Sequence, residues 1–168
     1  MPRTVTKAYP DARMQRIAEW TAQMLDAAEE TAWLIGCSPE AIVAQAALET
    51  GWGKSAIGHN IFGIKADSSW TGPKRLVTTR EVIDRQLVTL QAWFRDYSTY
   101  ADSIADHFAF LKANTRYADA FDAGSDEAYF AALQADGYAT DPNYAHTLMD
   151  MLASVQNLEK HMTPSGVA

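Results

Sequence analysis

The sequence predicts a mainly α-helical (α+β) domain with one small β insert. Apolar residues recur at helical spacing in the first 50 residues and again after residue 98. Between these two parts, residues 51–97 are broken by glycines and end in an alternating run at 87–94. The chain has 168 residues and no internal repeat or long linker. We therefore expect one domain over residues 13–160, with a flexible N-terminus (1–12) and a flexible tail (161–168).

Two helices are expected before the insert. The first covers about residues 11–35, where apolar or small side chains share one face: Met14, Ile17, Ala18, Thr21, Met24, Leu25 and Ala28. The second begins clearly, because Ser38 is a good N-cap, Pro39 suits the first turn and Glu40 complements the helix dipole. It is expected to end near Thr50, where Gly51 can stop it.

The insert is expected to contain a β-hairpin. Residues 87–94 alternate, which predicts a half-buried strand with Val88, Leu90, Ala92 and Phe94 on its inner face. Residues 76–82 are the expected partner strand, and the reversal falls at 83–85, where no glycine stands. Further helices are expected from Ser98, from Ser125 to Gly137, and after Asp141-Pro142. A cleft between the helices and the insert is the natural place for a ligand.

Composition excludes several classes of function. Fourteen Lys and Arg against 21 Asp and Glu give a formal charge of −7, which argues against nucleic acid as a partner. No apolar run is long enough for a membrane span.

The four histidines lack metal-ligand spacing, and we expect His107 and His161 to face solvent. Neither a metal nor a cofactor is expected. The N-terminus lacks the apolar segment of a secretory signal, so we expect synthesis in the cytoplasm without a signal peptide.

Glu49 is the most informative residue. It lies seven positions after Ile42 and four after Gln45, which places it on an otherwise apolar or small face of the second helix. Burial and the negative end of the helix dipole both raise the pKa of a carboxyl group there. A carboxylic acid that keeps its proton near neutral pH can act as a general acid. An exposed helix-end glutamate or a structural ion pair is the alternative.

Glycines and aromatic residues follow Glu49 closely. Gly51 and Gly53 flank Trp52, which permits a sharp turn and close approach by a bulky group. Phe62 and Trp70 come next, and aromatic faces are common platforms for sugar rings. A place in the core is the alternative for each of them.

These residues resemble the signature of glycoside hydrolase family 73. The family comprises endo-β-N-acetylglucosaminidases of peptidoglycan, including the muralytic domain of flagellar rod-assembly proteins. The resemblance rests on AALETGWG at 46–53 with NIFGIK at 60–65, TTREV at 78–82, FRDYS at 94–98 and GYATDPNY at 137–144. The segments follow the family's order, and the resemblance as a whole covers roughly residues 39–152, most of the chain.

The resemblance implies a lysozyme-like fold, with a helical lobe and a small β-hairpin lobe flanking a glycan groove. It implies Glu49 as general acid, Glu81 as second carboxylate and Tyr138 as a tyrosine that supports the reacting sugar. Asp84 competes with Glu81 for the second role, because this chain has Asp84-Arg85 where the family often has glycine. The expected substrate-binding residues are Trp52, Asn60, Phe62, Lys65, Trp70 and Tyr144.

The implied reaction is hydrolysis of the β-1,4 bond from N-acetylglucosamine to N-acetylmuramic acid. Glu81 can activate water or attack directly, or the substrate's N-acetyl oxygen can attack while Tyr138 orients it. The alternatives are a lytic transglycosylase or muramidase of similar fold, and a non-catalytic wall-binding or virion structural module. We expect a monomer whose partner is the peptidoglycan glycan strand. It would act on the cell wall, at its periplasmic or extracellular side, as a phage lysin, a virion-associated lysin or a bacterial enzyme.

Overall fold

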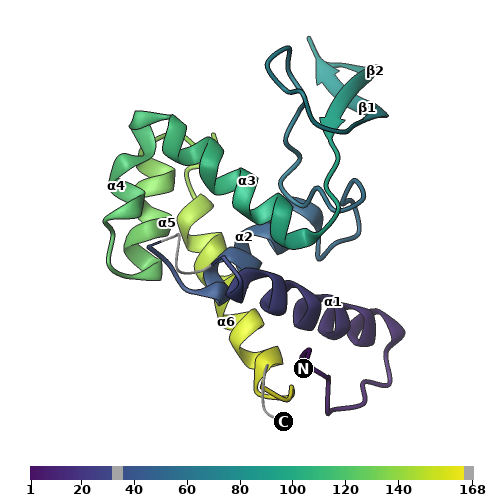
Figure 1. Ribbon diagram of the computed structural model, residues 1–168, viewed down its shortest axis with the longest axis vertical. Helices are drawn as coiled ribbons and strands as arrows, with labels where there is room; N and C mark the ends of the chain where they lie inside the picture. The colour runs from purple at the N-terminus through teal and green to yellow at the C-terminus, as the bar shows by residue number, and fades with distance from the viewer. Residues whose placement is uncertain (32–35, 165–168) are drawn as a thin grey trace.

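The computed structural model describes residues 1–31 and 36–164, apart from the side chain of Glu81. Figure 1 shows the helices packed together and one β-hairpin projecting away from them. The elements are α1 (Ala12–Glu29), α2 (Pro39–Thr50), β1 (Lys74–Ile83), β2 (Gln86–Arg95), α3 (Tyr100–Ala113), the 3-10 helix η2 (Thr115–Tyr117), α4 (Ala118–Phe121), α5 (Asp126–Ala135) and α6 (Tyr144–Glu159). The predicted α+β class is confirmed. In the described part, no helix is both long and apolar enough to cross a membrane.

Helix α2 forms the centre of the helical lobe and begins and ends as predicted. The hydroxyl of Ser38 accepts a hydrogen bond from the backbone N–H of Ala41, and Gly51 ends the helix with φ 57°. Residues 41–47 are all buried, because α2 packs against α1 on one side and α6 on the other. The last turn emerges from this packing, which places Glu49 at the edge of the core.

The predicted hairpin is present, and its turn has an unexpected composition. β1 and β2 pair antiparallel from Lys74 opposite Arg95 to Ile83 opposite Gln86. Asp84 and Arg85 connect them, and both have positive φ, 50° and 64°. A two-residue hairpin turn of this kind normally takes Asn or Gly, so the turn carries some backbone strain.

The expectation that residues 87–94 form a half-buried strand is wrong for most of their length. Phe94 is buried, while Val88 and Ala92 are only partly covered and Leu90 is exposed. The alternation itself has the expected phase. The reason for the exposure is that the hairpin extends beyond the helical lobe, so only its base finds a surface to pack against (Figure 1).

The base of the hairpin is held by the segment that precedes it. Arg95 N–H donates to the carbonyl of Ile64 at 3.0 Å, and Ala66 N–H donates to the carbonyl of Trp93 at 2.9 Å. Lys65 and Phe94 form an antiparallel bridge between these bonds. Residues 64–66 thus extend the sheet by a short third piece and join the two lobes.

Part of the N-terminal segment, which is expected to be flexible over residues 1–12, contacts the helices. The Arg3 guanidinium pairs with Asp26 and Glu29 of α1 and with Glu159 of α6. Val5 forms a bridge with Met162. Two smaller boundaries also differ from expectation: α3 is capped by Thr99 rather than Ser98, and α1 ends at Glu29, while residues 32–35 lie outside the described part.

Candidate active site

Glu49 stands at the end of α2 within a group of polar and aromatic side chains. The hydroxyl of Tyr144, at the start of α6, donates a hydrogen bond to Glu49 Oε1 at 3.4 Å. Gln45, one turn earlier on α2, donates from Nε2 to the same Tyr144 hydroxyl at 3.4 Å. Gln45 is fully buried, and its Oε1 has no hydrogen-bond partner among the described residues. The three side chains form one chain of contacts that ends at the carboxyl group of Glu49.

Tyr138 extends this group towards the neighbouring loop. Its ring stacks on that of Tyr144, with centroids 5.7 Å apart and planes inclined by 27°. Tyr138 directly follows Gly137, whose φ of 72° turns the chain after α5. The structure therefore brings together three of the predicted residues: Glu49, Tyr138 and Tyr144.

The surroundings favour the protonated form of Glu49. Burial of its carboxyl group raises the pKa of Glu49, although the residue as a whole is exposed to solvent. The hydrogen bond from Tyr144 lowers the pKa and so partly opposes this effect. Burial also raises the pKa of Tyr138, as does the nearby charge of Glu49. Glu49 is thus a solvent-accessible acid that retains its proton to higher pH than an ordinary glutamate, as its position on α2 predicted.

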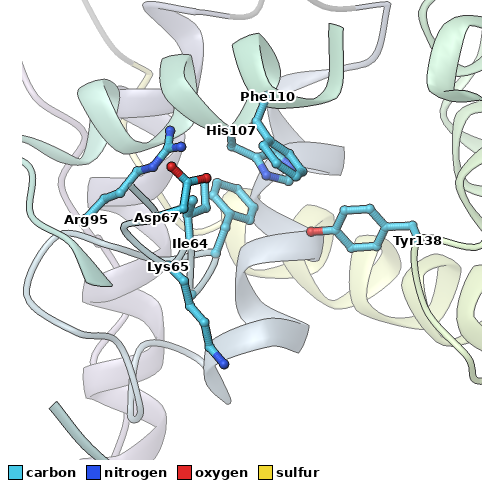
Figure 2. Close-up of a pocket in the computed structure, with 9 residues that line it drawn as sticks. Ile64, Lys65, Asp67, Arg95, His107, Phe110 and Tyr138 are labelled. Atoms are coloured by element: carbon cyan, nitrogen blue, oxygen red, sulfur yellow. The ribbon is translucent and has the colours of Figure 1, made fainter. Parts of the chain in front are cut away.

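A cleft of about 320 Å³ opens beside Tyr138, at the junction of the two lobes. Its lining consists of Phe62, Gly63, Ile64, Lys65, Asp67, Arg95, His107, Phe110 and Tyr138. In Figure 2, Tyr138 directs its hydroxyl towards the cleft from one side, His107 and Phe110 lie together above it, and Arg95 and Asp67 lie together on the other side. Phe62 and Lys65 were predicted to bind substrate, and both line this cleft.

His107 does not face solvent, so that prediction is wrong. The residue is only 1% exposed, and its ring stacks on Phe62 with centroids 3.8 Å apart. Burial lowers the pKa of His107 to about 3, so the imidazole is neutral at physiological pH. The helical pattern of α3 suggested a polar face here, but the loop that carries Phe62 covers it.

The Asn60 side chain is buried and has a structural role. Its Nδ2 donates to the carbonyls of Ile64 and Arg95, both at 2.9 Å, and its Oδ1 accepts from the N–H of Ile64 at 3.1 Å. The residue is 1% exposed. The side chain that we expected to touch sugar therefore fastens the loop at 60–64 to β2 and shapes the cleft from behind.

Trp70 lies near the cleft but is engaged by protein groups. Its Nε1 donates to the carbonyl of Pro73 at 2.9 Å, and the guanidinium of Arg95 lies 4.4 Å from the centre of its ring. The ring also meets Tyr97 edge to face. Trp70 thus supports Arg95, which itself lines the cleft.

Trp52 lies away from this group. Its ring packs edge to face against Trp20 at 6.2 Å, and it lines a separate cavity with Met14, Ile17 and Leu158 among others. Gly51, Trp52 and Gly53 all have positive φ, which turns the chain sharply away after Glu49. A Cβ at Gly53 would lie 2.3 Å from the Trp20 indole. The bulky group that approaches Gly53 is therefore the Trp20 indole of the protein itself.

The structure describes only the backbone of Glu81, the residue expected to supply a second carboxylate. Glu81 belongs to β1 opposite Val88, and its side chain lies outside the described part of the structure. Asp84, the competing candidate, is exposed in the hairpin turn. Among the described residues, no three His, Cys, Asp or Glu side chains are placed to hold a metal ion.

Sequence reasoning missed part of the cleft: Asp67, Arg95, His107 and Phe110. Arg95 lies in the FRDYS segment at 94–98, and this segment is the sequence signal for its place in the cleft. His107 and Phe110 carried no local signal, because their place in the cleft depends on the packing of α3 against the 60–65 loop.

Comparison with known proteins identifies close resemblances. The sequence matches the family model described as mannosyl-glycoprotein endo-beta-N-acetylglucosaminidase over residues 25–157. The peptidoglycan hydrolase FlgJ of Pseudomonas aeruginosa is 41% identical over 149 residues, which cover 84% of this chain and 37% of that protein. The chain thus spans little more than a third of that relative's length.

Two solved structures share the fold. A C-terminally truncated glycoside hydrolase domain of Salmonella typhimurium FlgJ has a TM-score of 0.73 and 37% identity, covering 84% of this chain and 98% of that one. A peptidoglycan hydrolase mutant from Sphingomonas sp. A1 has a TM-score of 0.73 and 34% identity, covering 86% and 99%. The predicted lysozyme-like architecture, a helical lobe joined to a small β-hairpin lobe, is confirmed.

Proposed function

Because this chain belongs to the endo-β-N-acetylglucosaminidase family, we propose that it hydrolyses the glycan strands of peptidoglycan. The proposed bond is the β-1,4 linkage from N-acetylglucosamine to N-acetylmuramic acid. The proposed partner of the protein is the glycan strand, and its proposed place of action is the cell wall. The observation that best supports the proposal is the state of Glu49, a solvent-accessible acid whose pKa burial raises, beside a cleft at the lobe junction.

In the proposed mechanism, Glu49 donates its proton to the glycosidic oxygen as the bond breaks and positive charge develops on the sugar ring. Tyr144 holds the carboxyl group through Oε1, which leaves Oε2 as the oxygen that can face the substrate. The high pKa of Tyr138 keeps its phenol protonated beside the cleft, so it can donate a hydrogen bond to the sugar.

Glu81 is the proposed second carboxylate. A direct attack on the sugar needs the two carboxyl groups about 5 Å apart, and activation of water needs roughly 6.5–9.5 Å. In a third route, the N-acetyl oxygen of the substrate attacks, and Tyr138 orients it. The variants Glu81→Gln and Asp84→Asn test which residue supplies the second carboxylate. A large loss of activity on changing Glu81 alone supports its role, and a large loss on changing Asp84 alone assigns that role to Asp84. Activity within a few-fold of wild type in both variants supports the third route.

The proposal is tested by digesting purified peptidoglycan with the wild-type protein and with Glu49→Gln. Mass spectrometry then identifies the sugar at each new end. We expect N-acetylglucosamine at the new reducing ends with wild type and no products with the variant. Glu127→Gln is a matched control, since Glu127 is exposed in the first turn of α5, and it should retain full activity.

Any other outcome would assign a different activity to the protein. N-acetylmuramic acid at the reducing end would make the protein a muramidase, and an anhydro product without added water would make it a lytic transglycosylase. Binding without new ends would make it a wall-binding module. Glu49→Gln should keep the thermal midpoint of wild type or slightly exceed it at neutral pH, because a neutral amide avoids the cost of protonating or ionising a buried carboxyl group. Loss of activity through unfolding is thereby distinguished from loss of the acid.

A further inference from the structure

The base of the hairpin is joined to α3 by side chains that meet at Asp106. Asp106 lies in the second turn of α3, and its Oδ2 accepts hydrogen bonds from Arg95 Nη1 at 2.8 Å and from the Tyr97 hydroxyl at 2.5 Å. Arg95 is the last residue of β2, and Tyr97 belongs to the short link between β2 and α3. Burial and the hydrogen bond to Asp106 raise the pKa of Tyr97, so its hydroxyl stays protonated and remains a donor.

These contacts are shielded from solvent, unlike an ordinary surface ion pair. The side chains of Arg95 and Asp106 are 12% and 21% exposed, and the Trp70 ring covers the Arg95 guanidinium at 4.4 Å. Arg95 Nε is buried and has no hydrogen-bond partner among the described residues. The second acid near Arg95, Asp67, is exposed to solvent, where an ion pair contributes little. Loss of Asp106 would therefore leave a shielded positive charge without its main partner.

The orientation of the hairpin is decided at this base, because the strands project beyond the helices (Figure 1). Two backbone hydrogen bonds hold β2 to the segment at 64–66. An attachment to one segment allows the strands to tilt about it, whereas a second attachment to α3 removes that freedom. A change of angle at the base moves the far end of the strands much further than the base itself. The contacts of Asp106 are thus placed to control the position of the whole hairpin.

We propose that Asp106 is a positioning residue, which clamps Arg95 and Tyr97 to α3 and so fixes the angle between the hairpin and the helical lobe. The inference rests on the proposed function, because the hairpin carries Glu81, the proposed second carboxylate. Asp106 does not line the cleft, so it acts on the reaction through the hairpin and not through the glycan. Without the clamp, the hairpin samples a range of angles, and Glu81 occupies its working position for a smaller fraction of the time.

A distance measurement between two spin labels tests the clamp and needs no substrate. The labels are attached to cysteines introduced at Gln86, beside the hairpin turn, and at Gln23 of α1, which are both exposed. Cys37 is replaced by alanine in every sample so that it takes no label. Pulsed electron paramagnetic resonance should give one narrow distance distribution for this reference protein. Adding Asp106→Ala should make the distribution about twice as wide or wider, because both hydrogen bonds to α3 are lost.

The effect on the reaction is measured as kcat and KM for solubilised peptidoglycan strands, with unlabelled proteins. Asp106→Ala should lower kcat by about tenfold or more and leave KM within about twofold, because the cleft that meets the glycan is unchanged. Asp106→Asn keeps one acceptor oxygen and should recover part of the loss. Should Asp106→Ala fail to fold, Tyr97→Phe decides, because it removes one donor and keeps the buried ring. It should lower kcat by about threefold.

Asp96→Ala is the matched control. Asp96 pairs with Arg75 at 3.2 Å, also at the base of the hairpin, but this pair does not reach α3. Its loss should leave the distance distribution unchanged and kcat within about twofold of wild type. Equal effects of Asp96→Ala and Asp106→Ala would show that any ion pair at the base serves equally, and would overturn the role of Asp106.

The two measurements also separate this inference from the proposed function. An unchanged distance distribution in Asp106→Ala, or a wider one with unchanged kcat, would overturn the positioning role even if the wild-type protein cleaves peptidoglycan. If the wild-type protein cleaves nothing, the proposed hydrolase is wrong. The distance distributions then still decide whether Asp106 clamps the hairpin.

Discussion

The hydroxyl of Tyr144 donates to Glu49 Oε1 across 3.4 Å, from the first residue of α6 to the last turn of α2. The contact fixes the carboxyl group while burial raises its pKa, and it also limits that rise because it favours the charged form. The packing of α6 on α2 therefore sets both the orientation of the proposed acid and the pH range in which it holds its proton.

Removing this hydroxyl should move the pH profile of hydrolysis. In Tyr144→Phe the carboxylate of Glu49 loses a donor, so its pKa rises further. Because the proposed acid works in its protonated form, the alkaline limb of the profile should shift to higher pH. Activity at the optimum should fall by about tenfold or less. The profile is measured on purified cell walls, and an alkaline limb that stays in place or moves to lower pH would contradict the role of Tyr144.

Gln45 should affect activity more than stability. In Gln45→Met the donor to Tyr144 is lost, and the activity should fall by about tenfold because that hydroxyl is no longer oriented towards Glu49. The variant also removes a buried oxygen that has no partner in the described part of the chain, so the free energy of unfolding should change by less than about 1.5 kcal/mol.

Denaturant titration and wall digestion on the same samples test this separation. Gln23→Met is the control, since Gln23 is exposed on α1. A loss of several kcal/mol without a loss of activity per folded molecule would show that Gln45 serves packing alone.

Burial of His107 should make the fold sensitive to acid. The unfolded chain takes up a proton at His107 below about pH 6.5, whereas the native protein resists protonation until about pH 3. The unfolded state binds more protons in this window, so stability should decline as pH falls, by up to about 1.4 kcal/mol per pH unit from this group. Urea unfolding of wild type and His107→Phe at several pH values isolates the contribution. Parallel pH dependence of the two proteins would show that His107 contributes nothing.

Arg3 should hold the N-terminal segment in place. Its side chain is 7% exposed and pairs with carboxylates on both α1 and α6, so Arg3→Ala leaves several acidic groups without their cation. We expect a loss of about 2 kcal/mol and a thermal midpoint lower by roughly 4–8 °C. Lys7→Ala, in the same segment, should change stability by less than about 0.5 kcal/mol. Equal effects of the two substitutions would show that residues 1–12 add little.

The features that were predicted well depend on residues close together in the sequence. Ser38, Pro39 and Gly51 define α2 by their own backbone preferences, and four-residue spacing places Gln45 and Glu49 together whatever surrounds them. The hairpin was predicted from the alternation of apolar and polar residues at 87–94. Its turn was uncertain, because Asp84 and Arg85 adopt a conformation that favours Asn and Gly.

What the sequence did not predict depends on contacts between distant segments. Asn60 is polar and near the motif, but its hydrogen bonds go to the backbone of β2. Trp52 looked like a sugar platform, yet three successive residues of positive φ direct it to Trp20. His107 was assigned to solvent because nothing in α3 shows that Phe62 covers it.

The attachment of the hairpin has a consequence for the distance between the two proposed carboxylates. The backbone bonds between the strands and the rest of the described chain lie at the base, to Ile64 and Ala66. Glu81 is six residues beyond Arg75, which faces Phe94 at that base, and this places its backbone about 20 Å outward. A tilt of about 10° there moves the Glu81 backbone by roughly 3.5 Å. Substitutions at residues 64–66 should therefore change the distance between Glu81 and Glu49 more than substitutions along the strands do.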